Sequence, residues 1–445
     1  MSICQNLTVE PDTITKSGAS KFQCKKLFKV APKEGRYKIW EVKCLKDGQK
    51  AFLKNLDFKG AISICCENNN IMEFLVEGSR SILVEKLLRE REIAFEIIGF
   101  ENTPGRSSSP RARSGFTSTI KSTWRKERLI LDWKDFYPLN IIYQWMDELE
   151  RLYPATCTVC SIGRTVEGRQ IKMLKISNSD AANTGVWLDG CIHAREWISG
   201  SVVTYIADHL VRNFSTLPQN ITNKDWYLVP IANPDGYQHT HTLDRLWRKS
   251  RARFGNSIVG VDLNRNFGFG WGHNGSEGSS VGDPNHQNYR GTEPFSEPES
   301  SAIKDLILYS GTPFKIFVTF HSCSELISFP WCYTSDPCPD YVNLLEGGAT
   351  IAKAMFETTG RMYKVGNFKD IMYYAPGTSI DWSYGIARIP FSYLIELRSR
   401  EHRFVLPKDE IIECCREALA GIFSLCEFAD TRKCLNCTVL TNKNR

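Results

Sequence analysis

The chain has 445 residues, which is enough for two or three domains at roughly 100–200 residues each. Hydrophobic residues make up 42% of it, so a large core can form and global disorder is excluded. The net charge of +6 is too small over this length to indicate nucleic-acid binding, and no run of about 18 apolar residues predicts a membrane span.

Residues 1–27 are polar and unpatterned, and we expect them to be disordered. They contain no apolar run of the roughly 7–15 residues that a secretory signal needs. Sixteen cysteines nevertheless favour an oxidising compartment, so we expect a secreted protein with disulfide bonds; the alternative is an intracellular protein with reduced thiols. Secretion would make glycosylation sites of the five sequons, at Asn6, Asn213, Asn220, Asn274 and Asn436.

Residues 28–102 are expected to form a small α+β domain of the ferredoxin-like kind. The pattern predicts β-α-β-β-α-β, which is the order of elements in that fold. No cluster of candidate catalytic residues occurs in this region. The predicted elements are a strand at 37–44, a helix at 49–56, strands at 62–66 and 71–76, a helix at 79–92 and a strand at 93–98.

Residues 103–128 break this pattern, because they are rich in Ser, Gly, Pro and basic residues. Such a tract is typical of an exposed domain linker, and it offers many sites to a trypsin-like protease. A plain solvated linker explains the composition equally well.

Residues 129–428 are predicted to form one α/β domain on a mixed, largely buried central sheet flanked by helices. Residues 429–445 are predicted to be a polar extension. Expected strands lie at 171–176, 186–188, 226–231, 314–320 and 391–397, and expected helices at 139–153, 198–211, 297–309, 341–358 and 409–427.

A candidate zinc site follows two of these strands. His193 and Glu196 come three residues apart on the turn after 186–188, so their side chains can converge on one point. A catalytic zinc site takes three protein ligands and leaves one position open. We expect the third ligand to be His321, which ends the strand 314–320 at the edge where open α/β sheets bind ligands. A lone His at such a place is more often structural.

A zinc site that activates water needs a base nearby, and Glu396 is the candidate. It interrupts the apolar strand 391–397, where a buried carboxylate is costly unless it is paired or functional. The alternative is that it simply pairs with Arg398. Arginines near 245–248 and 265 could grip a carboxylate in a bidentate way, although arginines are usually surface residues.

Taken together, these features resemble a zymogen of the pancreatic-type (A/B) zinc carboxypeptidases, over roughly residues 36–427. The motifs that carry the resemblance occur in the family's order. They are His-Ala-Arg-Glu-Trp at 193–197, Asn-Pro-Asp-Gly-Tyr at 233–237, Leu-Trp-Arg-Lys at 246–249, Asp-Leu-Asn-Arg-Asn at 262–266, Phe-His-Ser at 320–322, Ser-Ile-Asp-Trp-Ser-Tyr at 379–384 and Glu-Leu-Arg at 396–398.

The resemblance implies one Zn²⁺ ion per chain, held by His193, Glu196 and His321. It also implies a catalytic pair. Glu396 would be the base that takes a proton from the attacking water, and Arg248 would stabilise the tetrahedral oxyanion.

Four residues would bind the substrate, according to the same resemblance. Asn264 and Arg265 would clamp its free C-terminal carboxylate, Tyr373 would close over its last residue, and Arg195 would be an accessory contact. Asp262 would orient a ligand histidine from behind.

The resemblance further places Ile380 at the floor of the pocket for the last side chain, where relatives specific for basic residues carry an aspartate. Thr378 and Cys332 are uncharged as well, so a substrate ending in Arg or Lys would bury an unpaired cation. We therefore expect A-like specificity for hydrophobic C-terminal residues. Leu394 and Phe368 stand where we would expect smaller residues, which favours aliphatic over Trp side chains.

The sequence departs from the family in a few places. Cys323 replaces a usual tyrosine after His321, and the disulfide that relatives place near Ile258 and Asp283 is absent. The pairs Cys157/Cys160 and Cys434/Cys437 offer a structural zinc site as a minor alternative.

The expected protein is thus a secreted, monomeric precursor activated by a trypsin-like protease within 106–128, and its substrates are peptide C-termini. Its rivals are a non-catalytic binding protein on the same fold and a constitutive intracellular peptidase.

Overall fold

The computed structural model describes residues 36–43, 46–58, 62–68, 71–77, 80–102, 131–255, 257–273 and 280–432. The predicted disordered segment 1–27, the linker 103–128 and most of the extension 429–445 lie outside the described residues, so the domain boundaries stay predictions. Part of the extension is helical, because the last helix continues to Thr431.

The small N-terminal fold has the predicted order of elements, namely β1 (Arg36–Lys43), α1 (Asp47–Phe58), β2 (Ser63–Asn68), β3 (Ile71–Glu77), α2 (Ser81–Glu90) and β4 (Phe95–Asn102). The antiparallel sheet has the strand order β2-β3-β1-β4, which is the ferredoxin-like arrangement. Alternate residues of β3, among them Phe74 and Val76, point to one face and are buried against Val84 and Leu88 of α2.

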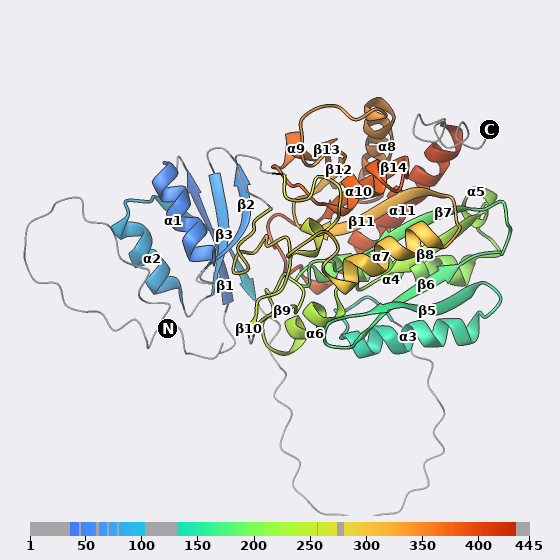
Figure 1. Ribbon diagram of the computed structural model, residues 1–445, viewed down its shortest axis with the longest axis horizontal. Helices are drawn as coiled ribbons and strands as arrows, with labels where there is room; N and C mark the ends of the chain where they lie inside the picture. Colours follow the sequence, from blue (N-terminus) through green and yellow to red (C-terminus); the bar gives the residue numbers. More distant parts are fainter. Residues whose placement is uncertain are drawn as a thin grey trace, which may run out of the picture.

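The larger region is built on one eight-stranded mixed sheet with the order β13-β12-β14-β11-β7-β8-β6-β5 (Figure 1). Strands β14, β11, β7 and β8 run parallel at its centre, and β6 and β5 continue it in antiparallel fashion. The strands are β5 (Cys157–Arg164), β6 (Gln170–Ile176), β7 (Thr184–Asp189), β8 (Lys224–Val229), β11 (Phe314–Ser322), β12 (Leu326–Phe329), β13 (Lys364–Asn367) and β14 (Phe391–Leu397); β9 (Arg253–Phe254) and β10 (Ser257–Ile258) form a separate hairpin.

Helices cover both faces of this sheet, and each face has its own apolar core. Helices α3, α4, α8 and α11 bury side chains in the larger core, and α7 and α10 contribute to the other. The predicted α/β class is confirmed. The helices are α3 (Leu139–Leu152), α4 (Trp197–Asn213), α5 (Gln219–Thr222), α6 (Pro234–Thr242), α7 (Pro298–Tyr309), α8 (Tyr341–Thr359), α9 (Phe368–Ile371), α10 (Ser379–Gly385) and α11 (Ile411–Thr431), with short 3₁₀ turns η4 (Leu263–Arg265) and η5 (Lys408–Glu410).

The centre of the sheet determines where a site can form. The parallel strands β7, β11 and β14 end at the same edge, so residues at their carboxyl ends meet there. His321 on β11 lies directly opposite Glu396 on β14, and Thr319 lies opposite Asp189 on β7.

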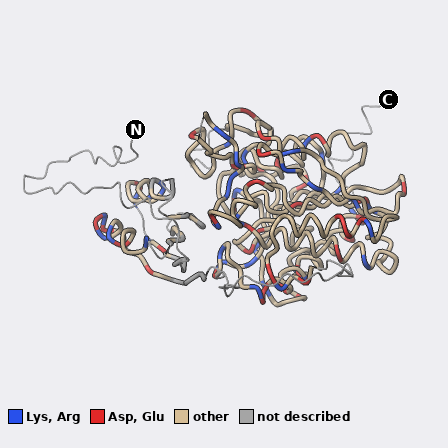
Figure 2. Tube along the Cα trace, turned by 90° about the horizontal axis from the view of Figure 1, so that it is seen from below, with Lys and Arg blue, Asp and Glu red and all other residues tan. Residues whose placement is uncertain are grey.

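Charged residues of both signs are interspersed along the described chain. In the view of Figure 2, positions of Lys and Arg lie among those of Asp and Glu, as the small net charge leads one to expect. No helix of the described residues is both long and apolar enough to cross a membrane.

Candidate metal centre and active site

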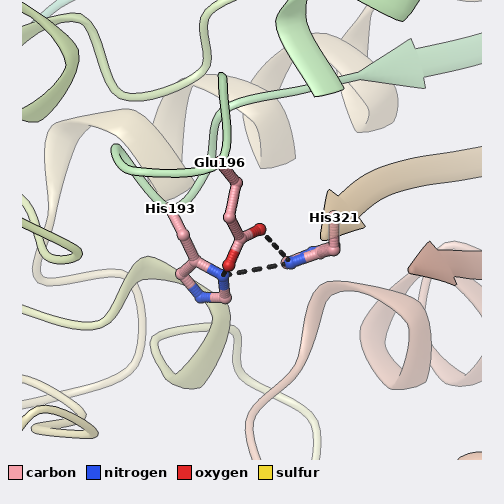
Figure 3. Close-up of side chains that lie close together, drawn as sticks. All are labelled: His193, Glu196 and His321. Atoms are coloured by element: carbon pink, nitrogen blue, oxygen red, sulfur yellow. Dashed lines mark hydrogen bonds and ion pairs between the residues drawn. The ribbon is translucent and has the colours of Figure 1, made fainter. Parts of the chain in front are cut away.

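Three buried side chains from two segments meet at this edge of the sheet (Figure 3). The turn between β7 and α4 carries His193 and Glu196, and β11 delivers His321. His193 Nδ1 lies 2.9 Å from Glu196 Oε1, and His321 Nδ1 lies 3.0 Å from His193 Nδ1 and 3.1 Å from Glu196 Oε2. Two nitrogen donors and one carboxylate therefore converge on one point, as the spacing predicted.

The state of His193 suits a metal ligand. Burial lowers the pKa of His193, and the neighbouring Arg248 lowers it further, so the imidazole is neutral. Its outer nitrogen Nε2 donates to Asp262 Oδ1 at 3.0 Å, which leaves the lone pair of Nδ1 facing Glu196 and His321. A carboxylate behind a ligand histidine is the usual arrangement in zinc sites.

The ionisation of Glu196 also suits a metal ligand. Burial by itself would raise the pKa of Glu196, but the imidazoles of His193 and His321 outweigh it and hold that pKa below its usual range. The group is thus an anionic ligand. A His₂Glu set with ordered outer contacts is a donor set that catalytic Zn²⁺ takes.

Glu396 lies beside this cluster. It is buried, and its Oε2 has no hydrogen-bond partner within the described chain. Burial and the negative charge of Glu196 raise the pKa of Glu396. The alternative that Arg398 pairs with it is wrong, because Arg398 Nε donates instead to Glu417 Oε1 of α11 at 3.0 Å. The carboxylate is left with a free oxygen at the metal site.

Arg248 borders the cluster on another side. Its Nη2 donates to Asp262 Oδ2 at 2.9 Å, and its Nη1 lies 3.6 Å from Glu196 Oε1. Asp262 therefore contacts both Arg248 and His193. It fixes the guanidinium beside the ligands while it orients the imidazole.

The predicted substrate-binding residues fall into two groups. Asn264 accepts from the backbone N–H of Ser379 through Oδ1 at 2.9 Å, which joins the 262–266 and 379–384 motifs. Arg265 donates to the Tyr373 hydroxyl from Nη2 at 3.3 Å. Arg195 makes a different contact, with its guanidinium 4.0 Å from the centre of the Phe404 ring.

Ile380 is fully buried on α10. It belongs to the same apolar cluster as Cys332, Phe368 and Leu394. The carboxylate of the neighbouring Asp381 faces the backbone and accepts from the N–H groups of Cys332 and Tyr333, at 2.9 Å and 3.2 Å.

Some residues have roles that were not predicted. Arg245, grouped with the arginines that could grip a carboxylate, instead stacks 3.6 Å from the Trp197 ring and donates to the Arg195 carbonyl at 2.8 Å, so it braces the ligand turn. Asp189 and Thr319 lie behind His321. Asp189 has the same signal as Glu396, a carboxylate at the end of an apolar strand.

Eight cysteines of the described chain, at positions 157, 160, 191, 332, 338, 414, 415 and 426, are free thiols, so the expected disulfide bonds receive no support from the described residues. Cys157 is buried and Cys160 is exposed on β5, because positions three apart in a strand face opposite sides. They cannot hold one ion together. Cys434 and Cys437 lie outside the described residues.

Comparisons with known proteins agree with this site. The zinc carboxypeptidase (peptidase M14) family model matches residues 142–421. Carboxypeptidase B of Astacus astacus is 37% identical over 301 residues, which are 67% of this chain and 98% of that protein. Zinc carboxypeptidase A 1 of Anopheles gambiae is 35% identical over 317 residues, which are 70% of this chain and 72% of that protein.

Solved structures extend the similarity to the small N-terminal fold. Thrombin activatable fibrinolysis inhibitor superposes with a TM-score of 0.77 at 26% identity, covering 89% of this chain and all of that one. Carboxypeptidase A of Helicoverpa armigera gives 0.73 at 26% identity, covering 89% of this chain and 98% of that one.

The chain belongs to the zinc carboxypeptidase family. It is a metallocarboxypeptidase that acts on peptide C-termini, with a zinc site formed by His193, Glu196 and His321. The rival interpretation as a non-catalytic binding protein is set aside.

Proposed function

We propose that this carboxypeptidase removes hydrophobic C-terminal residues, preferably aliphatic ones, and that it is made as a zymogen. The observation that carries the specificity is the buried, uncharged position of Ile380 within an apolar cluster. A cationic side chain placed there would lose its hydration without gaining a partner, which costs several kcal/mol or shifts its protonation.

Three residues around the metal are assigned roles. A bound zinc ion lowers the pKa of a water molecule and polarises the scissile carbonyl. Glu396, with its unpartnered Oε2, takes the proton from the attacking water and later gives it to the leaving amine. Arg248 stabilises the oxyanion, and Asp262 keeps both Arg248 and His193 in place.

The substrate's terminal carboxylate is bound by Arg265 and Asn264, with Tyr373 beside them. A guanidinium recognises a carboxylate with two parallel hydrogen bonds, and an internal peptide bond has no such charge. This explains why the enzyme would act as an exopeptidase. Arg195 supplies a further positive charge near the ligand turn.

The size of the pocket supports a preference for aliphatic residues. Phe368 and Leu394 are both buried in the Ile380 cluster and reduce the space available there. Protein interiors are packed at high density, so an indole ring would need these side chains to move. The names of the relatives include carboxypeptidases A, B and O, and they do not decide between specificities.

Zymogen activation is supported by the position of the small fold. Burial and the charge of Lys249 lower the pKa of His286, and Lys54 of α1 makes a smaller contribution in the same direction, so α1 lies near that imidazole. The loop that contains His286 is held by Lys249, which donates to the carbonyls of Pro284 and His286 at 2.9 Å and 3.0 Å. Lys249 follows Arg248 directly, so the small fold lies near one wall of the site.

We propose in addition that a trypsin-like protease cuts within 106–128, and that the enzyme is a secreted monomer. One observation favours the rival intracellular peptidase, namely the eight free thiols among the described cysteines. Glycan on Asn213 or Asn220 of the native protein would support secretion, and an unmodified protein would support the rival.

The function is tested by measuring kcat/KM on blocked dipeptides that differ only in the last residue, before and after trypsin treatment. We expect activity to rise on cleavage, to be lost with a chelator, and to follow the order Leu or Ile, then Phe, then Trp, with Arg and Lys far below. Equal activity before and after cleavage would contradict the proposal that the enzyme is made as a zymogen. Preferred release of Arg or Lys would contradict the proposed apolar pocket around Ile380.

A further inference from the structure

A second buried carboxylate lies behind the zinc site, on the side of His321. Asp189 Oδ1 accepts from the Thr319 hydroxyl at 2.7 Å, and its Oδ2 accepts from Trp187 Nε1 at 2.6 Å. The Thr319 oxygen lies 3.3 Å from His321 Nε2. All of these side chains are buried, and Thr319 and Asp189 are register partners on β11 and β7.

The hydrogen count at Thr319 fixes the direction of these bonds. A hydroxyl has one proton to donate and two lone pairs to accept with. Because that proton goes to Asp189, Thr319 can only accept from His321. The Nε2 of His321 must then carry hydrogen, so Nδ1, which faces His193 and Glu196, is the nitrogen that can offer a lone pair to a metal ion.

Another neighbour of His321 would favour the opposite tautomer. Asn264 Nδ2 lies 3.4 Å from His321 Nε2, and its amide orientation is fixed because Oδ1 accepts from the Ser379 N–H. An amide nitrogen is a donor only, so this contact by itself would put hydrogen on Nδ1 and remove the lone pair a metal needs. Something must outweigh it.

We propose that Asp189, acting through the Thr319 hydroxyl, is the positioning group that holds His321 in its metal-binding tautomer. The arrangement parallels the direct contact of Asp262 with His193, but it uses one intervening hydroxyl. Neither residue touches the metal or the substrate. Their role is to set how tightly the site retains zinc, since outer contacts of this kind change metal affinity by about 10–100-fold.

The test measures the zinc dissociation constant of the full chain by competition with a chelator of known affinity, without any substrate. Thr319→Val keeps the shape of the side chain but removes the acceptor, and Thr319→Ser restores the hydroxyl. We expect Thr319→Val to bind zinc about 10–100-fold more weakly, and Thr319→Ser to stay within about threefold of the native chain.

Asp189→Asn tests the direction of the relay. In this variant the amide oxygen of Asn would accept from Trp187, and the amide nitrogen would donate to the Thr319 hydroxyl. The hydroxyl proton would then point toward His321 Nε2. We expect at least a tenfold loss of zinc affinity, and a ¹⁵N spectrum of the metal-free protein in which Nε2 of His321 has lost its hydrogen.

Native zinc affinity in Thr319→Val would overturn the proposal. If Thr319→Val fails to fold by circular dichroism, Asp189→Asn decides instead, and an unchanged tautomer and affinity would overturn it. Both readouts are independent of substrate specificity and of zymogen activation, so failure of those proposals leaves this result interpretable.

Discussion

Replacing Glu396 with Gln is the sharpest test of the site. The change keeps the size of the side chain and its position opposite His321, but it removes the base. The carboxylate has a free oxygen and lies outside the His193–Glu196–His321 set, so zinc should stay bound at one ion per chain. General-base catalysis contributes about 10²–10⁴-fold, and a loss of about 10³-fold in kcat corresponds to about 4 kcal/mol of barrier.

The assay is kcat and KM on a blocked dipeptide ending in Leu after trypsin treatment, with zinc content measured on the same samples. Glu299→Gln is a matched control. Glu299 is also buried, burial raises its pKa to about 8, and neither of its oxygens has a partner in the part of the chain described. Its raised pKa favours the neutral form at pH 7, so the amide should leave kcat unchanged. If Glu396→Gln retains zinc and loses less than tenfold in kcat, the assignment of the base is refuted.

Four further predictions follow from the same geometry. Burial and Glu196 raise the pKa of Glu396, and only its anion is a base. On the acid side of the pH profile, kcat/KM should therefore fall tenfold per pH unit below an inflection that lies above the usual glutamate pKa of about 4.3. An inflection at or below that value would contradict the raised pKa. Arg265→Ala should lower kcat/KM by about 10–150-fold on free C-termini, a loss of about 1.5–3 kcal/mol, and should leave the slow hydrolysis of C-terminal amides unchanged; an equal loss on both would exclude a carboxylate clamp. Ile380→Asp should raise the ratio of kcat/KM for Arg over Leu substrates by at least tenfold, and an unchanged ratio would show that Ile380 is not at the pocket floor. Glu417→Ala leaves the buried guanidinium of Arg398 short of its main partner, so urea unfolding should show a loss of about 3–5 kcal/mol, against less than about 0.5 kcal/mol for the exposed Glu427→Ala on the same helix.

The regular elements were largely predictable from local patterns. The six elements of the small fold appear in the predicted order, and the five predicted strands of the large sheet are present. The missed strands are β5, β12 and β13, which lie toward the edges of the sheet. Two of these are only four residues long, and so short a run has no periodicity that separates a strand from a loop.

Partners of buried charges were less predictable. Arg398 follows Glu396 by two residues, so the sequence offered it as a partner, but it binds Glu417 on α11 instead. Asp189 was similarly hidden, because its role depends on the register of β7 against β11. The sequence predicts which charged residues are buried, but the tertiary fold determines which group pairs with each of them.

The amino-acid sequence alone determined the class of fold and the positions of the polar residues that end its apolar strands, because both depend on local periodicity and on the cost of burying charge. Only the tertiary structure decided that His321 Nδ1 lies 3.0 Å from His193 Nδ1, that Glu396 keeps an unpartnered oxygen, and that Thr319 faces Asp189. These distances join segments more than a hundred residues apart, and they are set by strand register and side-chain packing rather than by any property of the separate segments.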